Sequence, residues 1–134
     1  MTLGSCSISE VLQCDSNHSV IKVSRILRDK NARHVLVVDK GKPVGVISVT
    51  DINNRLVAED KDASETKVYE IMSKDIIVKD KNDGLTKTYV ELLKANKYSC
   101  VIVDKGKVKG MIDMKELMNC IVKEKNKNGR IKGS

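Results

Sequence analysis

The feature that most constrains this chain is an internal repeat with a spacing of 65 residues. The segment Val-Leu-Val-Val-Asp-Lys-Gly-Lys at 35–42 returns as Cys-Val-Ile-Val-Asp-Lys-Gly-Lys at 100–107. The same spacing, without a gap, also pairs residues outside this segment: Asp15 with Asp80, Leu27 with Leu92, Gly45 with Gly110, and Ile47 with Ile112. A chain written twice predicts two copies of one supersecondary unit that stabilise each other.

Both copies predict the same order of elements, β-α-β-β-α. Helices are expected where apolar residues recur with a 3.6-residue period, and strands where short Val- and Ile-rich runs occur. The elements expected in the first copy are a strand at 11–14, a helix at 20–27, strands at 35–38 and 44–49, and a helix from Thr50. The second copy predicts strands at 76–79, 99–103 and 108–112, a helix at 85–95, and a closing helix. Gly41 in the first hairpin turn suits a positive φ angle.

The sequence divides into a first copy at 1–60, a linker at 61–66, a second copy at 67–124 and a basic flexible tail at 125–134. The linker prediction rests on its small and charged residues, and a short helix is expected at 67–72. The closing helix carries an i, i+3, i+4, i+7 stripe of Met114, Leu117, Met118 and Ile121. Core packing and a subunit interface explain this stripe equally well.

Composition narrows the classes of function. Three Tyr are the only aromatic residues, which does not suit proteins that stack nucleic-acid bases on aromatic side chains. The net charge is +7, but residues 123–134 hold five basic residues and one acidic residue. A solvated chain end is the simplest reading of this basic tail, and a nucleic-acid-binding tail is the alternative.

The four cysteines, at positions 6, 14, 100 and 120, form no Cys-x-x-Cys pair, and no His stands at metal-ligand spacing from them. Cys14 and Cys100 interrupt strand-like apolar runs, where a free thiol behaves as a small hydrophobic group. Free thiols without a signal peptide or membrane span predict a cytoplasmic protein. No paired carboxylates, metal cluster, activated nucleophile or phosphate loop indicates an enzyme.

The duplicated β-α-β-β-α order resembles the cystathionine-β-synthase (CBS) domain family over about residues 8–124. In each copy Val-Val-Asp or Ile-Val-Asp precedes the turn, and Gly-x-x-Ser-x-x-Asp follows it at 45–51. The resemblance implies an α+β fold in which two CBS repeats pack through their sheets with pseudo-twofold symmetry. It also implies two clefts that bind adenosine-containing ligands, regulation of a partner protein rather than catalysis, and a homodimer.

The first site is predicted where the strand ending near Ser48 runs into a helix. A helix N-terminus attracts phosphate, and the hydroxyls of Ser48 and Thr50 add donors. The Asp51 carboxylate can accept hydrogen bonds from a ribose diol. A purely structural reading stays open, in which Ser48 or Thr50 caps the helix and Asp51 is an acid favoured in its first turn.

The resemblance implies that each site is completed by the other copy. For the first site the completing residues are Ile76, Ile77, Tyr98 and Ser99. For the second site, the motif residues are Asp113, Lys115 and Glu116, completed by Arg33 and His34. Asp113 replaces the serine, and a carboxylate about 4 Å from phosphate costs about 4 kcal/mol at an effective dielectric near 20. The second site is therefore predicted to bind nucleotide weakly or not at all.

The sequence thus predicts a regulatory module that senses AMP, ADP or ATP and acts on an unknown protein, without catalytic cofactor, metal or membrane. S-adenosylmethionine is the alternative ligand. Nucleic-acid binding by the basic tail is the alternative function.

Overall fold

The computed structural model describes the backbone of residues 1–133 and the side chains of residues 1–126. The chain forms two compact units. The first-copy unit is Val11–Ile76, and the second-copy unit combines Met1–Glu10 with Ile77–Ser134. The predicted boundaries, 1–60 and 67–124, follow the copies along the sequence and miss this exchange of segments in space.

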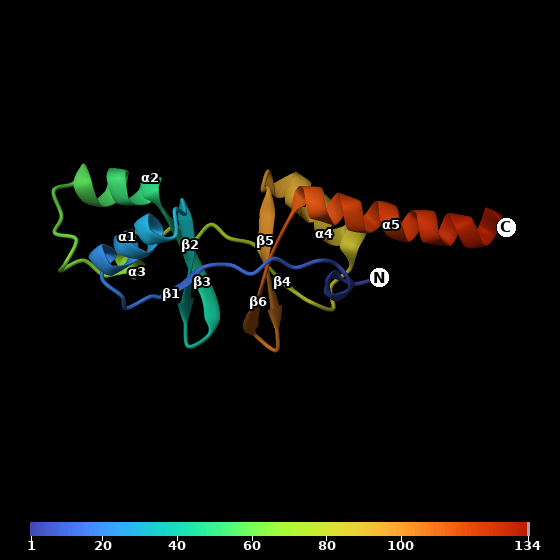
Figure 1. Ribbon diagram of the computed structural model, residues 1–134, viewed down its shortest axis with the longest axis horizontal. Helices are drawn as coiled ribbons and strands as arrows, with labels where there is room; N and C mark the ends of the chain where they lie inside the picture. Colours follow the sequence, from blue (N-terminus) through green and yellow to red (C-terminus); the bar gives the residue numbers. More distant parts are fainter. Residues whose placement is uncertain (134) are drawn as a thin grey trace. The chain divides into compact units, whose positions relative to one another are not determined.

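The first-copy unit has a three-stranded sheet with helices on one face (Figure 1). Its elements are β1 (Gln13–Asp15), α1 (Val20–Asp29), β2 (His34–Asp39), β3 (Lys42–Ser48), α2 (Val49–Ile52), the π-helical turn η2 (Asn53–Val57) and α3 (Val68–Ile71). The strand order is β1-β2-β3, with β1 parallel and β3 antiparallel to β2.

The second-copy unit repeats this plan. Its elements are the 3₁₀ turn η1 (Leu3–Ser5), β4 (Val78–Asp80), α4 (Leu85–Ala95), β5 (Ser99–Asp104), β6 (Lys107–Asp113) and α5 (Met114–Gly133). The sheet order is β4-β5-β6, with the same parallel and antiparallel pairings. The predicted α+β class and the duplicated β-α-β-β-α order are confirmed.

The hairpin turns explain why both copies keep a Lys-Gly pair. Lys40 and Gly41 have φ angles of 53° and 82°, and Lys105 and Gly106 have 53° and 80°. Positive φ at both central residues is the geometry of the tight two-residue turn that matches the twist of a hairpin. The predicted positive φ of Gly41 is confirmed.

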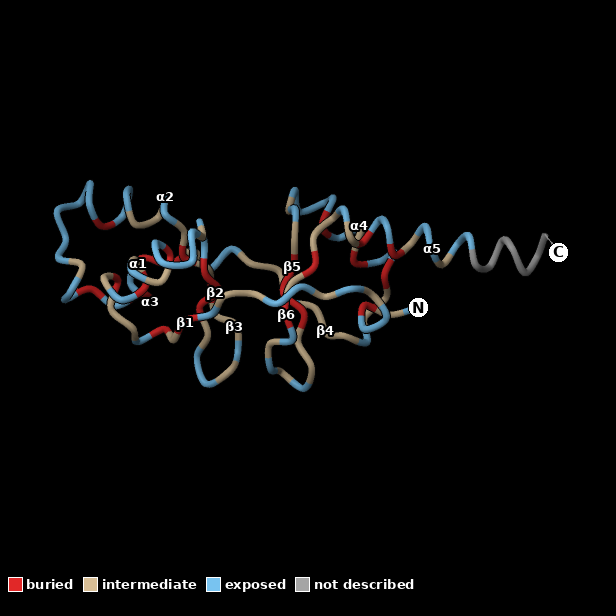
Figure 2. The backbone as a smooth tube through the Cα atoms, in the orientation of Figure 1, coloured by how far each residue is buried: buried red, intermediate tan, exposed pale blue. Residues whose placement is uncertain are grey.

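Each unit has its own apolar core between its sheet and its helices (Figure 2). In α1, Ser19 caps the first turn by accepting a hydrogen bond from the Lys22 N–H at 3.3 Å, and Val20, Val23 and Leu27 are buried. These positions follow the predicted 3.6-residue period. The two cores contain aliphatic side chains and cysteines almost throughout, as the composition predicted.

Two strand predictions were displaced along the chain. The strands predicted at 11–14 and 76–79 are observed at 13–15 and 78–80, so Ile76 and Ile77 precede β4. Sheet pairing runs past the apolar residues into Asp15 and Asp80, because the parallel partner strands β2 and β5 continue opposite them.

Three predictions concern α5 and the linker. Of the predicted stripe, Leu117 is buried and Met114 and Ile121 pack against the second core, whereas Met118 is 39% exposed. In the predicted linker, the carbonyls of Thr66 and Ala63 accept hydrogen bonds at 2.9 Å from the Val20 and Ile21 N–H groups at the start of α1, and the linker assignment stays a prediction. The tail predicted at 125–134 is helical through Gly133, its side chains from 127 onward lie outside the described residues, and its flexibility stays a prediction.

A short closing segment completes each sheet edge. Ser73 exchanges two backbone hydrogen bonds with Val46 of β3, at 2.8 and 2.9 Å, and Ser9 does the same with Met111 of β6, both at 2.9 Å. Glycine permits this approach, since a Cβ at Gly45 would lie 2.6 Å from the Ser73 carbonyl oxygen. The N-terminal counterpart of residues 67–73, which the sequence left undefined, is therefore the segment at 2–9.

Candidate functional site

The β3–α2 junction holds the predicted first motif, and its centre is a capping box. The Asp51 N–H donates to Oγ of Ser48 at 3.1 Å, and the Ser48 N–H donates to Oδ2 of Asp51 at 2.9 Å. Oγ of Ser48 and Oδ2 of Asp51 are also 3.0 Å apart in a hydrogen bond. This pairing satisfies two N–H groups at the helix start. The structural expectation, in which Ser48 caps the helix and Asp51 is an acid in its first turn, is thus confirmed.

The other carboxylate oxygen of Asp51 has a different environment. Among the described residues Oδ1 has one ionic neighbour, Nε of Arg55 at 3.9 Å, and it accepts no hydrogen bond. The Asp51 side chain is 16% exposed. Capping therefore uses one oxygen and leaves Oδ1 able to accept from a ligand hydroxyl.

Arg55 is a residue that the sequence analysis missed. Its Nη1 donates to the carbonyl oxygens of Ile71 and Met72, both at 3.1 Å. Arg55 thus links the end of α3 to the turn that carries Asp51. The signal in the sequence was its position four residues after Asp51, which places both side chains on one helical face.

The junction also brings Arg33 and His34 close to the first motif. His34 lies opposite Ser48 in the β2–β3 pairing, and the Val49 N–H donates to the Arg33 carbonyl at 2.9 Å. Both side chains are exposed. They therefore adjoin the motif of their own copy, and their predicted contribution to the second site stays a prediction.

The second motif uses its aspartate differently. Oδ1 of Asp113 accepts from the Glu116 N–H at 2.8 Å, so Asp113 caps α5 as Ser48 caps α2. A carboxylate at this position already complements the positive helix end. The arrangement agrees with the physical reason for predicting a weaker second site, although nucleotide binding there is untested.

Of the remaining predicted residues, Tyr98 and Ser99 lie at the second junction. Ser99 lies opposite Asp113 in the β5–β6 pairing, and the Tyr98 carbonyl accepts from the Met114 N–H at 2.8 Å. The Tyr98 side chain is 68% exposed. Thr50 and Lys115 are exposed, and Ile76 and Ile77 are partly buried. In the structure Tyr98 and Ser99 adjoin the second motif, so their predicted role at the first site stays a prediction.

The cysteines fall into two chemically distinct pairs. Burial raises the pKa of the Cys14 thiol to about 11 and that of Cys100 to about 12, so both stay protonated near neutral pH. Cys14 and Cys100 are free thiols, as predicted, whereas Cys6 and Cys120 form a disulfide that the sequence did not predict. The cytoplasmic location inferred from free thiols therefore stays a prediction.

An apolar hollow of about 320 Å³ lies between α1 and α2 of the first-copy unit. Its lining includes Leu27, Ala32, Val49 and Ile52. None of the predicted site residues lines this hollow, so it is separate from the Asp51 carboxylate.

Within the described residues, no group of three or more His, Cys, Asp or Glu side chains is arranged to hold a metal ion. A search of the same part of the chain found no helix with the length and hydropathy needed to cross a bilayer.

The fold and the two junctions define a class, a tandem repeat of β-α-β-β-α units. The sequence matches the CBS domain family twice, over residues 3–58 and 68–123. These matches cover most of the chain, which therefore belongs to the CBS domain family.

Solved structures of other CBS proteins share this fold. A CBS domain protein of Pyrobaculum aerophilum complexed with AMP has a TM-score of 0.66 at 18% identity, covering 87% of this chain and 89% of that one. The CBS domain pair of protein MJ0100, in complex with 5′-methylthioadenosine and S-adenosyl-L-methionine, has a TM-score of 0.66 at 22% identity, covering 92% and 98%. At these identities the likeness concerns the fold alone.

Two curated relatives are longer proteins. An uncharacterized protein of Methanocaldococcus jannaschii is 31% identical over 89% of this chain and 39% of its own length. A homoserine O-acetyltransferase of Methanococcus vannielii is 27% identical over 78% of this chain and 22% of its own length. The chain thus spans only a minor part of either relative, and the acetyltransferase match concerns that part.

Proposed function

We propose that this chain is a regulatory module whose first copy binds an adenosine-containing ligand through Asp51. The observation that carries the proposal is that the two oxygens of this carboxylate differ in their hydrogen bonds. Oδ2 accepts from Ser48, whereas Oδ1 accepts no hydrogen bond from the described residues. A ribose hydroxyl that donates to Oδ1 would form a charge-assisted hydrogen bond at a partly desolvated site.

We propose different roles for the two hydroxyls of the motif. The Ser48 hydroxyl is engaged with Asp51 in the capping box, so we give it a positioning role. Thr50 is exposed in the first helical turn and is the hydroxyl that we assign to a ligand phosphate. Nε of Arg55, 3.9 Å from Oδ1, helps to keep the carboxylate in place.

The ligand class has support from the two family members named above, which were solved with AMP and with 5′-methylthioadenosine and S-adenosyl-L-methionine. All three ligands contain an adenosine, so recognition of the ribose would be common to them. Binding counts as regulation when the ligand favours one of two states of the module. The regulated partner in this proposal is another protein or another domain, and the module itself is not catalytic.

The test is a thermal-shift panel of AMP, ADP, ATP, S-adenosylmethionine and GMP on the unaltered chain. A ligand at a hundred times its dissociation constant is expected to add about 2.7 kcal/mol of stability. Asp51→Asn should reduce the ligand-induced stabilisation by at least half at the same ligand concentration. Asp83→Asn is the matched control, because Asp83 likewise accepts from a backbone N–H, that of Asp80 at 2.9 Å.

The expected result is stabilisation by at least one adenosine ligand, a reduction of that stabilisation by at least half in the Asp51 variant and its full retention in the Asp83 variant. If no adenosine ligand stabilises the chain, or if the Asp51 variant responds fully, the proposed site is wrong. Isothermal titration should give one ligand per chain, since the second motif is predicted to bind weakly.

A further inference from the structure

The closing segments of the two units are equivalent in detail. In the first-copy unit the Val68 N–H donates to the His18 carbonyl at 2.9 Å. The 65-residue spacing relates Leu3 to Val68 and Asp83 to His18, and the Leu3 N–H likewise donates to the Asp83 carbonyl at 2.9 Å. The bridge between Lys67 and Ser19 likewise returns as the bridge between Thr2 and Gly84. Residues 1–10 therefore occupy on the second unit the place that residues 67–73 occupy on the first.

The two units fasten these equivalent segments by different chemistry. In the first-copy unit Arg55 binds the carbonyls of Ile71 and Met72. The 65-residue spacing places Cys120 at the position of Arg55 and Cys6 at the position of Ile71. The disulfide thus stands where the arginine clamp stands in the other copy.

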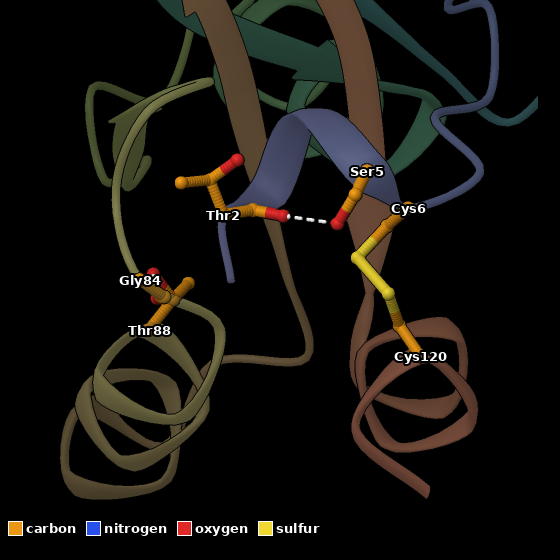
Figure 3. Close-up of a disulfide and its surroundings, with 6 residues drawn as sticks. All are labelled: Thr2, Ser5, Cys6, Gly84, Thr88 and Cys120. Atoms are coloured by element: carbon orange, nitrogen blue, oxygen red, sulfur yellow. Dashed lines mark hydrogen bonds between the residues drawn. A yellow bond between two sulfur atoms is a disulfide. The ribbon is translucent and has the colours of Figure 1, made fainter. Parts of the chain in front are cut away.

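Figure 3 shows how the disulfide holds its segment. Cys6 follows η1, and its side chain points to Cys120 on α5. The turn is compact because Oγ of Ser5 donates to the Thr2 carbonyl at 2.7 Å. Leu3 of the same turn is fully buried in the second core, together with Leu117. The crosslink joins a segment that fills part of this core to the helix that packs beside it.

We propose that Cys6 and Cys120 form a thiol–disulfide exchange site, whose oxidation state determines how firmly residues 1–10 stay docked on the second-copy unit. The proposal goes beyond ligand binding and is independent of it. Cys6 is partly exposed and Cys120 is buried, so an incoming thiol reaches the sulfur of Cys6 first. Cys14 and Cys100 are buried free thiols in the cores and are not reactants.

The reaction is an exchange with a dithiol of low molecular mass or on a protein. A dithiol thiolate attacks Sγ of Cys6, a mixed disulfide forms, and Cys120 leaves as a thiolate that takes up a proton. The second thiol of the reagent then displaces Cys6. The protein gains two electrons and two protons, and the dithiol becomes a disulfide. An oxidised dithiol reverses both steps.

Reduction removes the covalent clamp from the second unit and leaves Arg55 in the first. The segment at 2–9 then depends on its backbone hydrogen bonds and on the burial of Leu3. Local opening of this segment should therefore become more frequent. The equivalent segment at 67–73 provides an internal control in the same molecule.

The first test counts thiols in the full chain. After unfolding without reductant, alkylation should modify two cysteines, Cys14 and Cys100, and after treatment with dithiothreitol it should modify four. In the folded protein, dithiothreitol should expose only Cys6 and Cys120 to alkylation. Four modified thiols in aerobically prepared, unreduced protein would overturn the proposal.

The second test measures amide hydrogen exchange of the folded chain with and without dithiothreitol. Exchange at Ser9 and Met111 should accelerate at least tenfold on reduction, while exchange at Val46 and Ser73 should not change. The Cys6→Ser variant should behave as reduced protein and ignore dithiothreitol. Unchanged exchange at Ser9 and Met111 on reduction, or an equal change in both units, would show that the disulfide does not control docking. If the Cys6→Ser variant does not fold, the comparison of the unaltered chain with and without dithiothreitol still tests the proposal.

Discussion

At the residue scale, the two carboxylate oxygens of Asp51 have different environments. One carboxylate oxygen takes part in the capping box, and the other accepts no hydrogen bond from the described residues. Asp113 occupies the capping position of the second motif itself, where it accepts from the Glu116 N–H. Each aspartate thus caps its helix, and only the contacts of its carboxylate with the preceding strand end differ between the two copies.

Thiol reactivity gives a prediction at the residue scale. Because burial raises the pKa of Cys14 to about 11 and that of Cys100 to about 12, the folded protein holds both as thiols at pH 9. At pH 9 a thiol of pKa 11 is about 1% thiolate, and only the thiolate is nucleophilic. An unfolded thiol of ordinary pKa is about half thiolate at this pH, so alkylation by iodoacetamide at pH 9 should be at least about fiftyfold slower in folded protein than after unfolding. Equal rates, measured by mass spectrometry, would contradict the burial of these thiols.

At this scale the sequence predicted the position of Asp51 but not how its two oxygens are used. Residue types and spacing place an aspartate in a first helical turn, yet they leave open which atoms its neighbours bind. The contact of Arg55 with the carbonyls of Ile71 and Met72 joins residues 16 and 17 positions apart, and no local pattern encodes it.

At the scale of elements, each sheet edge depends on a glycine where the closing segment crosses. A Cβ at Gly45 would lie 2.6 Å from the Ser73 carbonyl oxygen and 2.8 Å from Sδ of Met72, so the segment would have to move. Gly45→Ala should lower the free energy of unfolding by about 1 to 3 kcal/mol, the usual cost of overpacking. Denaturant unfolding measures this loss.

The control for Gly45→Ala is Gly84→Ser. A Cβ at Gly84 meets nothing nearer than Cβ of Lys87 at 4.0 Å, and serine is favoured at the N-cap that Gly84 occupies. This variant should keep or raise the stability. Equal losses in both variants would mean that the close crossing at Gly45 does not matter.

The arginine clamp gives a second prediction for an element. Arg55→Met keeps the aliphatic stem but removes both hydrogen bonds to the end of α3. Because this side chain is 52% exposed, we expect a modest loss of about 1 kcal/mol, with faster amide exchange at Ser73. Arg28→Met is the control, since Asp29 is the one ionic partner of Arg28 among the described residues and Arg28 is 72% exposed. Unchanged exchange at Ser73 would show that Arg55 does not hold the segment.

At the scale of the whole molecule, the sequence predicted the repeat and missed the exchange of segments. The 65-residue spacing predicted two units of one topology, because matching residues impose matching turns and cores. The segment at 2–9 docks on the second unit and that at 67–73 on the first. Leu3 and Val68 are equivalent buried residues. The residues next to them differ so much between the two copies that the 65-residue repeat cannot be recognised there. The sequence did not predict the disulfide either, because no local pattern joins two cysteines that are 114 residues apart.

The central claim is that a ribose hydroxyl donates to the Asp51 carboxylate, and a cycle of two changes tests it directly. Isothermal titration would measure the affinity of unaltered protein and of Asp51→Asn for AMP and for 2′,3′-dideoxy-AMP. If the hydroxyls and Asp51 interact, removing either partner weakens binding, and removing both costs little more than removing one. The expected coupling is about 1.5 to 3 kcal/mol, which is roughly tenfold or more in affinity. Additive losses, or equal binding of both ligands by the unaltered protein, would contradict the account.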